Sequence, residues 1–476
     1  MLAIGVPLVC SVVLLAGAAA LLVHSIRGAS ARPLHPAMRV VLPLLGVIYV
    51  AGIWWGVPWR GWAPDEIPPS VFLDAIDRHF AHGWHDKYPP VHFYLNAALY
   101  LPFVVAARAG RLDLTTNAVQ IVLLLVSRAL SLLMAIGSIV ALYIVADDLY
   151  GPPGSVFAAA IGGVTLPFVY YAKLANVDVP YLFWFAWSMV FYVRLIRRER
   201  TVDAFLFALT AVTAVETKDQ AYGFYVLPML HVAFTRRRTL PVTLATGLAA
   251  FVLESNVLFN PSGFVEHVRA VAGVGGDLNR QPDASVGARL LTLARLTSIN
   301  LGWSMTWPGV LAAIAGIVAE IRLRRFLWLL LPVISYAMFF LTTITSVFDR
   351  YLLGVYMILA VFAGAWIGAL VRADAPNRRA RLLLCAAGTV LLAWYGASID
   401  LMMLKDSRYP AQRWLRERPS ADARVALIGP RAYLPGVDSR QVVRGLSSPA
   451  GTAPAELPDF LVVNTQVMRR QELPAL

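Results

Sequence analysis

The stretch from Trp62 to Pro90 reads WAPDEIPPSVFLDAIDRHFAHGWHDKYPP, and it decides how the rest of the chain is interpreted. Nearly everything around it is apolar enough for a lipid bilayer. This stretch instead gathers carboxylates, histidines and a lysine: Asp65, Glu66, Asp74, Asp77, His79, His82, His85, Asp86 and Lys87. Because charged groups are costly within a membrane, such a cluster indicates chemistry or ion binding at one membrane face.

The composition outside this stretch is that of a membrane protein. Of 476 residues, 58% are hydrophobic and only 14% are charged, against about 25% charged residues in soluble domains. The mean hydropathy is +0.64. Continuous apolar runs of roughly 18 or more residues recur, which predicts an all-α polytopic protein and excludes the weak alternating segments of a β-barrel.

The net charge of +13 comes with basic clusters between apolar runs, at 194–200, 236–238 and 322–325. This is the positive-inside pattern of membrane proteins, and it excludes nucleic acid as a partner. Cys10 and Cys385 both lie within apolar runs, so no disulfide or zinc motif is expected.

The positions of the basic clusters along the chain set the predicted topology. The run 2–23 lacks a preceding basic residue and is interpreted as a retained helix rather than a cleaved signal, and a second span covers about 38–57. Residues 91–109 either cross the membrane or lie along its outer interface. Only the second choice keeps every later basic cluster inside, so 58–117 is predicted to be an outer loop with juxtamembrane helices.

Ten further spans follow, which makes about twelve within a transmembrane domain over 1–400. They are expected at about 118–146, 154–173, 180–196, 203–216, 220–235, 240–257, 304–321, 326–343, 351–371 and 382–399. This topology brings scattered charged residues to one outer face, namely Asp65, Glu66, Lys87, Asp178, Lys218, Asp349 and Arg350. An outer loop is expected over 258–303.

A polar tail over 401–476 predicts a small α/β C-terminal domain outside the cytoplasm. Residues 425–428 and 460–463 have the composition of two buried strands, and 409–417 is expected to form a helix beside them.

The outer-face residues each allow two interpretations. Asp65-Glu66 is either an acidic pair for general-base catalysis or the start of a helix after Pro64. Lys87, before the rigid turn Pro89-Pro90, either holds a phosphate or snorkels at the interface.

The remaining charged residues also have alternative interpretations. Asp178 is either functional or a helix cap, and Lys218 must line a wet cavity or lie near the surface. Arg350 either grips a phosphate through its forked guanidinium or pairs with Asp349. Arg128 lies inside a predicted span and needs a partner, for which Asp178 or a substrate is suitable.

The three histidines recur at every third residue. His79, His82 and His85 would share a helix face and either bind a metal ion or form a polar interfacial helix, but Gly83 breaks the helical order. We predict no metal site and no cofactor.

In the order of these motifs, the chain resembles the C-type (GT-C) integral-membrane glycosyltransferases, in particular the relatives of protein O-mannosyltransferases and lipid A aminoarabinose transferases. The resemblance covers most of residues 38–400. Five motifs carry it: Asp65-Glu66, Lys87-Tyr88-Pro89-Pro90, Asp178-Val179-Pro180, Thr217-Lys218 and Arg350-Tyr351. Tyr88, inserted between the lysine and the prolines, and the small C-terminal domain depart from the family pattern.

The resemblance implies an inverting transfer of a sugar from a polyprenyl-phosphate carrier to an acceptor hydroxyl on a glycan, lipid or protein. It implies Asp65 as the base, assisted by Glu66. The expected donor-phosphate residues are Lys87, Lys218, Arg350 and Tyr351, and the supporting residues are Arg128, Asp178 and His92. The expected location is the plasma or inner membrane, among its lipids, with the site on the extracytoplasmic side.

Two other classes compete with this interpretation. A transporter or flippase of polyprenyl-linked or anionic lipids would place charges along a transmembrane path and usually has repeated halves, whereas here the charges share one face and no repeat is found. A non-catalytic scaffold, or a polysaccharide polymerase or ligase of related architecture, is the third possibility.

Overall fold

The computed structural model describes residues 34–58, 61–278, 285–372, 374–417, 423–428, 431–436 and 459–464, with isolated residues between 13 and 20. The first predicted span, 2–23, therefore lies outside the continuously described ranges.

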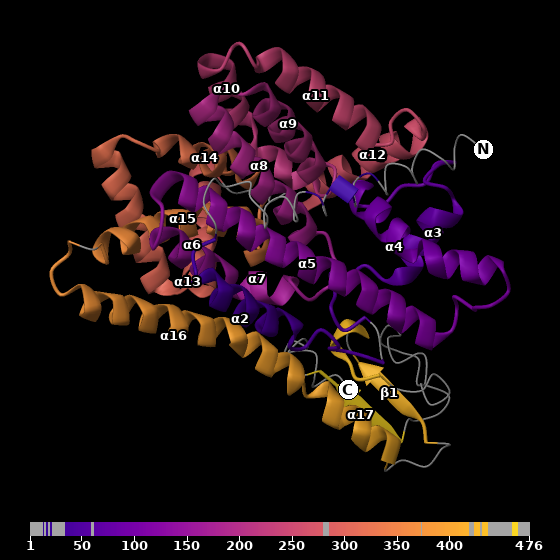
Figure 1. Cartoon of the computed structure of the whole chain (residues 1–476). Coiled ribbons are helices and arrows are strands. Elements are labelled where there is room, and N and C mark those ends of the chain that lie inside the picture. Colours follow the sequence, from indigo (N-terminus) through magenta and orange to yellow (C-terminus); the bar gives the residue numbers. More distant parts are fainter. Residues whose placement is uncertain are drawn as a thin grey trace.

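Most of the described chain is helical, as the sequence predicts (Figure 1). The helices before residue 260 are α2 (Met38–Val50), α3 (Pro69–Asp77), α4 (Val91–Arg108), α5 (Asn117–Tyr150), α6 (Gly154–Gly163), α7 (Leu166–Tyr171), α8 (Asp178–Arg198), α9 (Thr201–Val215), α10 (Val226–Thr235) and α11 (Leu240–Glu254). The later helices are α12 (Pro261–Leu278), α13 (Val286–Leu323), α14 (Leu331–Phe339), α15 (Leu353–Leu370), α16 (Arg378–Leu404) and α17 (Arg408–Glu417).

Among the described residues, five helical segments are long and apolar enough to cross a membrane: Asn117–Tyr150, Asp178–Arg198, Val286–Leu323, Asp349–Leu370 and Arg378–Glu417. Five further apolar helices, including α9 and α11, have 10–17 residues. The chain is thus a helical membrane protein, while the count of about twelve spans stays a prediction.

Helix α8 forms the centre of the bundle. It packs against α5 and α9. The most apolar 18-residue stretch of α8 is fully buried, as expected for a helix that is hydrophobic on all sides. Helices α6 and α15 approach closely through glycines. A β-carbon at Gly364 would lie 2.4 Å from the carbonyl oxygen of Gly154, so only glycine permits this contact.

The segment 58–117 contains two helices: α4, which covers the predicted 91–109, and α3, whose bounds the sequence did not predict. Helix α3 begins at Pro69, so Asp65 and Glu66 precede it and do not form its first turn. It ends at Asp77, and both His79 and His82 adopt positive φ angles. The expectation that the three histidines share one helix face is therefore wrong.

Two predicted segment boundaries also need correction. The expected loop over 258–303 contains α12 and the first half of α13, which continues through the predicted span to Leu323 with a kink at Thr306. The expected span 154–173 is two helices, because the chain leaves helical geometry after Gly163 and α7 restarts with Pro167 in its first turn.

The C-terminal elements lie beside the end of α16 (Figure 1). Strands β1 (Val425–Ile428) and β2 (Phe460–Val463) form the two predicted strands and pair in parallel, with Val425 opposite Phe460. Arg408 at the start of α17 fixes this region to the bundle. Its guanidinium carbon lies 5.1 Å from the ring of Trp55 and 4.2 Å from the ring of Trp62, which are cation–π contacts.

Candidate active site

Asp65 and Arg350 form an ion pair, although they are distant in sequence. Oδ1 of Asp65 lies 2.5 Å from Nη1 of Arg350. Asp65 belongs to the loop before α3, and Arg350 belongs to the 3-10 turn η4 (Asp349–Leu352) that leads into α15. The Asp65 side chain remains 34% exposed, so the pair lies at an accessible end of the bundle.

A second ion pair joins α8 to the segment after α9. Nζ of Lys218 lies 2.5 Å from Oδ1 of Asp178, and both side chains are buried. Asn176 donates a 3.0 Å hydrogen bond to Oδ2 of Asp178 and fixes that carboxylate. Burial lowers the pKa of Lys218, and the charge of Asp178 opposes this shift. Asp178 thus has a charge partner beyond its place at the start of α8.

Tyr351 connects the two ion pairs. Its ring centroid lies 5.6 Å from Nζ of Lys218 and 5.6 Å from the guanidinium carbon of Arg350. Both distances are within the range of cation–π contacts. Two cations, two carboxylates and one tyrosine therefore meet where the N-terminal ends of α8 and α15 and the C-terminal end of α9 come together.

Glu66 differs from its neighbour Asp65. Its two carboxylate oxygens accept 2.7 Å hydrogen bonds from Nε and Nη2 of Arg128, and Oε1 also accepts a bond from the backbone N–H of Ala175. Both side chains of the pair are buried. The partner of Arg128 is thus Glu66, and the expectation of Asp178 or a substrate in that place is corrected.

Lys87 is exposed, and its Nζ lies 4.9 Å from the ring centroid of Tyr88. Burial raises the pKa of Tyr88, and the nearby charges of Asp178, Arg350 and Asp65 also influence it. The inserted tyrosine therefore lies near the ion-pair cluster, which sequence reasoning missed because it treated Tyr88 only as a departure from a motif.

His92 is fully buried in α4, where its ring nitrogen Nε2 lies 3.1 Å from Nδ2 of Asn96. The His92 side chain therefore belongs to the packed interior around α4 and not to the two ion pairs.

Sequence reasoning missed two further features. Tyr171, at the end of α7, lies within electrostatic range of both Asp65 and Arg350. A buried ion pair between Lys173 and Asp400 also connects this region to α16. The Tyr170-Tyr171 doublet beside a lysine in an apolar run was the signal available in the sequence. Within the described ranges, no group of three or more His, Cys, Asp or Glu side chains is arranged to hold a metal ion.

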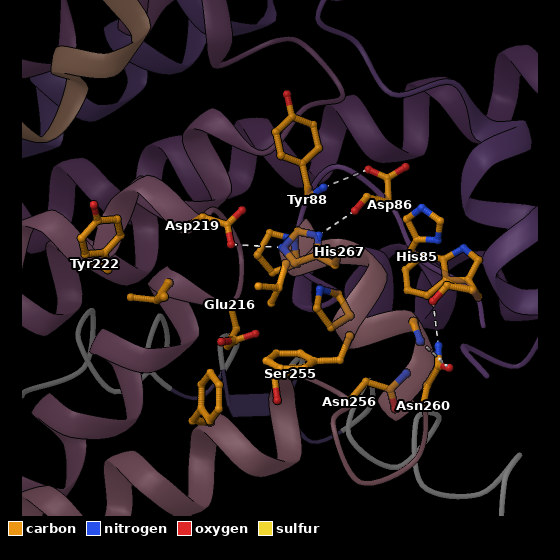
Figure 2. Close-up of a pocket in the computed structure, with 18 residues that line it drawn as sticks. His85, Asp86, Tyr88, Glu216, Asp219, Tyr222, Ser255, Asn256, Asn260 and His267 are labelled. Carbon is orange, nitrogen blue, oxygen red and sulfur yellow. Dashed lines mark hydrogen bonds and ion pairs between the residues drawn. The ribbon is translucent and has the colours of Figure 1, made fainter. Parts of the chain in front are cut away.

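A cavity of about 280 Å³ lies next to the ion-pair cluster, between the segments 84–90, 215–222 and 251–268 (Figure 2). His267 of α12 joins its walls. Nδ1 lies 2.7 Å from the carbonyl oxygen of Asp86, and Nε2 lies 3.1 Å from Oδ1 of Asp219. Burial alone would lower the pKa of His267, but the hydrogen bond and charge of Asp219 raise it above its ordinary value.

The cavity and the ion pairs are adjacent. Tyr88 lines the cavity and lies close enough to Asp65 for that charge to influence its pKa, while Lys218 of the cluster directly precedes Asp219 of the cavity wall. We call this space the loop cavity.

No protein-family profile and no curated protein sequence matches the chain. Among solved structures, the chain is similar to the oligosaccharyltransferase of Archaeoglobus fulgidus, with a TM-score of 0.49 and 12% identity over 82% of this chain and 60% of that one. It is also similar to ArnT from Cupriavidus metallidurans bound to undecaprenyl phosphate, with a TM-score of 0.48 and 12% identity over 84% of each chain.

A third similar structure is the Archaeoglobus fulgidus oligosaccharyltransferase AglB in complex with an inhibitory peptide and a dolichol-phosphate, with a TM-score of 0.48. These three solved structures each share 12% sequence identity with the chain. This chain spans 60% of the length of the first of these proteins, and no residue role is transferred from any of them.

Proposed function

We propose that this protein is an inverting glycosyltransferase that moves a sugar from a polyprenyl-phosphate carrier to an acceptor hydroxyl. The acceptor belongs to a glycan, a lipid or a protein, and the reaction takes place at the extracytoplasmic face of the plasma or inner membrane. The observation that carries the proposal is the ion pair between Asp65 and Arg350, with the second cation, Lys218, connected to it through Tyr351.

The proposed reaction needs few groups. A lipid phosphate is already a competent leaving group, so the enzyme must remove the acceptor proton and stabilise the charge on the departing phosphate. Asp65 is the proposed base, because it is an accessible carboxylate beside the cations. A single displacement by the acceptor oxygen breaks the bond between the sugar and the phosphate and inverts the anomeric carbon.

Arg350 and Lys218 are the proposed phosphate-binding residues. Nε and Nη1 of Arg350 are buried and make no hydrogen bond among the described residues, which supports a role for this guanidinium toward a ligand. Lys218 supplies a second positive charge held in place by Asp178. Tyr351 and the exposed Lys87 complete the proposed donor site.

Glu66 assists Asp65 indirectly in this proposal. Its paired hydrogen bonds with Arg128 fix the backbone next to Asp65, so we assign both residues to positioning. His92, which packs within α4, supports the same loop.

The decisive experiment measures transfer of radiolabel from undecaprenyl-phosphate hexoses and pentoses, using purified protein in lipid nanodiscs. Asp65→Asn should reduce turnover by about 10²–10⁴-fold, the usual contribution of a general base, and should leave donor binding intact. Asp74→Asn is the matched control, because Asp74 lies in α3 of the same loop, is exposed and pairs only with Arg78, just after α3, among the described residues.

Full turnover in Asp65→Asn would exclude Asp65 as the base. Lipid translocation by the wild-type protein that persists in Asp65→Asn, with no sugar transfer from any donor, would instead identify a flippase.

A further inference from the structure

The loop cavity contains buried polar atoms that the protein leaves without partners. Ser255 and Asn256, at the end of α11, are 5% and 4% exposed. Within the described part of the chain, Oγ of Ser255 and Oδ1 of Asn256 have no hydrogen-bond partner. Both residues line the cavity, and buried polar groups are normally paired, so these two polar side chains are candidates for contact with a polar ligand.

A third polar group in the wall is the carboxyl of Glu216, which is 5% exposed. A carboxyl group supplies two oxygen atoms that can accept hydrogen bonds. The wall therefore offers acceptors for the hydroxyl groups of a ligand.

The rest of the lining favours a neutral ligand. Trp84, Phe251 and Phe264 supply aromatic surface, and none of the described residues that line the cavity is a lysine or an arginine. Both ring nitrogens of His267 are engaged by Asp86 and Asp219, as the dashed lines in Figure 2 show. A phosphate or carboxylate would therefore meet acidic groups and no free cation.

The size of the cavity limits the ligand to one ring. Its volume of about 280 Å³ is at the lower end of the roughly 300–1,000 Å³ typical of small-molecule sites. Aromatic surface for the apolar side of a ring, combined with polar side chains in the same wall, suits a neutral polyol.

We propose that the loop cavity binds one neutral sugar ring and presents it to the ion-pair cluster across Tyr88. This inference rests on the proposed transferase function and names the subsite that holds a sugar during the reaction. The ring belongs either to the acceptor or to the donor, because both carry the same hydroxyl chemistry.

The first test is binding of methyl glycopyranosides, measured by saturation-transfer NMR on the full-length protein in nanodiscs. The glycosides of glucose, mannose, galactose and arabinose serve as probes, with inorganic phosphate as the anionic comparison. Val268→Trp should remove the signal, because Val268 lines the cavity and is 48% exposed, so a larger side chain can enter the opening without unfolding the core.

The matched control is Val271→Trp. Val271 is on the same helix, is 38% exposed and does not line the cavity, so this variant should bind glycosides as the wild type does. No saturation transfer to any glycoside, or an unchanged signal in Val268→Trp, would overturn the inference and would leave the proposed transferase activity to be judged by its own assay.

Transfer kinetics then identify the source of the sugar. If the ring belongs to the acceptor, Val268→Trp raises the acceptor KM by 10-fold or more and leaves the donor Kd unchanged. If it belongs to the donor, the same variant weakens binding of the polyprenyl-phosphate sugar but not of bare polyprenyl phosphate. Unchanged values for both substrates would contradict a role for the cavity in the reaction.

Discussion

Replacing Glu66 by alanine should destabilise the protein strongly, and this effect separates its role from that of Asp65. The substitution leaves the guanidinium of Arg128 buried, since the side chains of the pair are only 3% and 2% exposed. It removes two 2.7 Å charge-assisted hydrogen bonds and the acceptor for the backbone N–H of Ala175.

The expected loss of stability follows from these lost contacts. Breaking a buried ion pair by removing one partner costs about 3–5 kcal/mol, mainly because the other charge stays buried. Arg128 keeps its hydrogen bonds to the carbonyl oxygens of Ile53 and Trp55, which partly satisfy the guanidinium and favour the lower end of this range. Glu66→Gln keeps the shape of the side chain and should cost less.

The assay is thermal unfolding in nanodiscs, followed by tryptophan fluorescence, for Glu66→Ala, Arg128→Leu and the double variant. The double variant should be more stable than the sum of the single effects predicts, because neither charge is then left alone. Asp65→Asn should unfold close to the wild type. If Glu66→Gln instead kept full stability and lost as much turnover as Asp65→Asn, the positioning role would be refuted in favour of direct catalysis by Glu66.

Three other predictions follow from the same structure. Lys218→Met should lower stability by leaving the Asp178 carboxylate buried and unpaired, and adding Asp178→Asn should restore stability but not donor affinity, as thermal unfolding and donor-binding titrations would reveal. Gly364→Leu should destabilise by about 1–3 kcal/mol through overpacking in the same unfolding assay, whereas Gly388→Leu, where a β-carbon meets no atom within 4 Å, should be neutral. The raised pKa of His267 makes its stabilising charge fully present below the ordinary value of 6.5 and lost as the pH rises through the higher folded-state value, so stability should fall over that range in the wild type and less in His267→Gln.

The common location of the charged residues could be predicted from the sequence because it depends only on topology. Once the basic clusters were assigned to one side, the helix ends carrying Asp178, Lys218 and Arg350 had to share the other side with Asp65. The structure joins these four residues in two ion pairs. The strands of the C-terminal region were also predictable, since short apolar runs in a polar tail are distinctive.

Partner choice could not be predicted in the same way. Glu66 and Arg128 are 62 positions apart, and their pairing depends on how the loop before α3 packs against α5. The loop cavity depends on α12, which the sequence analysis treated as part of a loop. Two adjacent acids, Asp65 and Glu66, look equivalent in sequence, and only packing buries one and leaves the other accessible.

The ion pair between Asp65 and Arg350 is compatible with a basic role for Asp65, because one guanidinium has several donors in fixed directions. Nη1 is ion-paired with Asp65, and among the described residues neither Nη1 nor Nε makes a hydrogen bond. A phosphate oxygen bound at Nε would leave Asp65 on the same rigid plane, so Arg350 would set the separation between the base and the leaving group. Lys218 cannot set this separation, because the N–H donors of an ammonium group are not held in a fixed plane. Its contribution in the proposed site is its positive charge. Arg350 therefore positions the leaving phosphate relative to the base Asp65. Lysine at position 350 would keep the positive charge but would no longer fix this relative position.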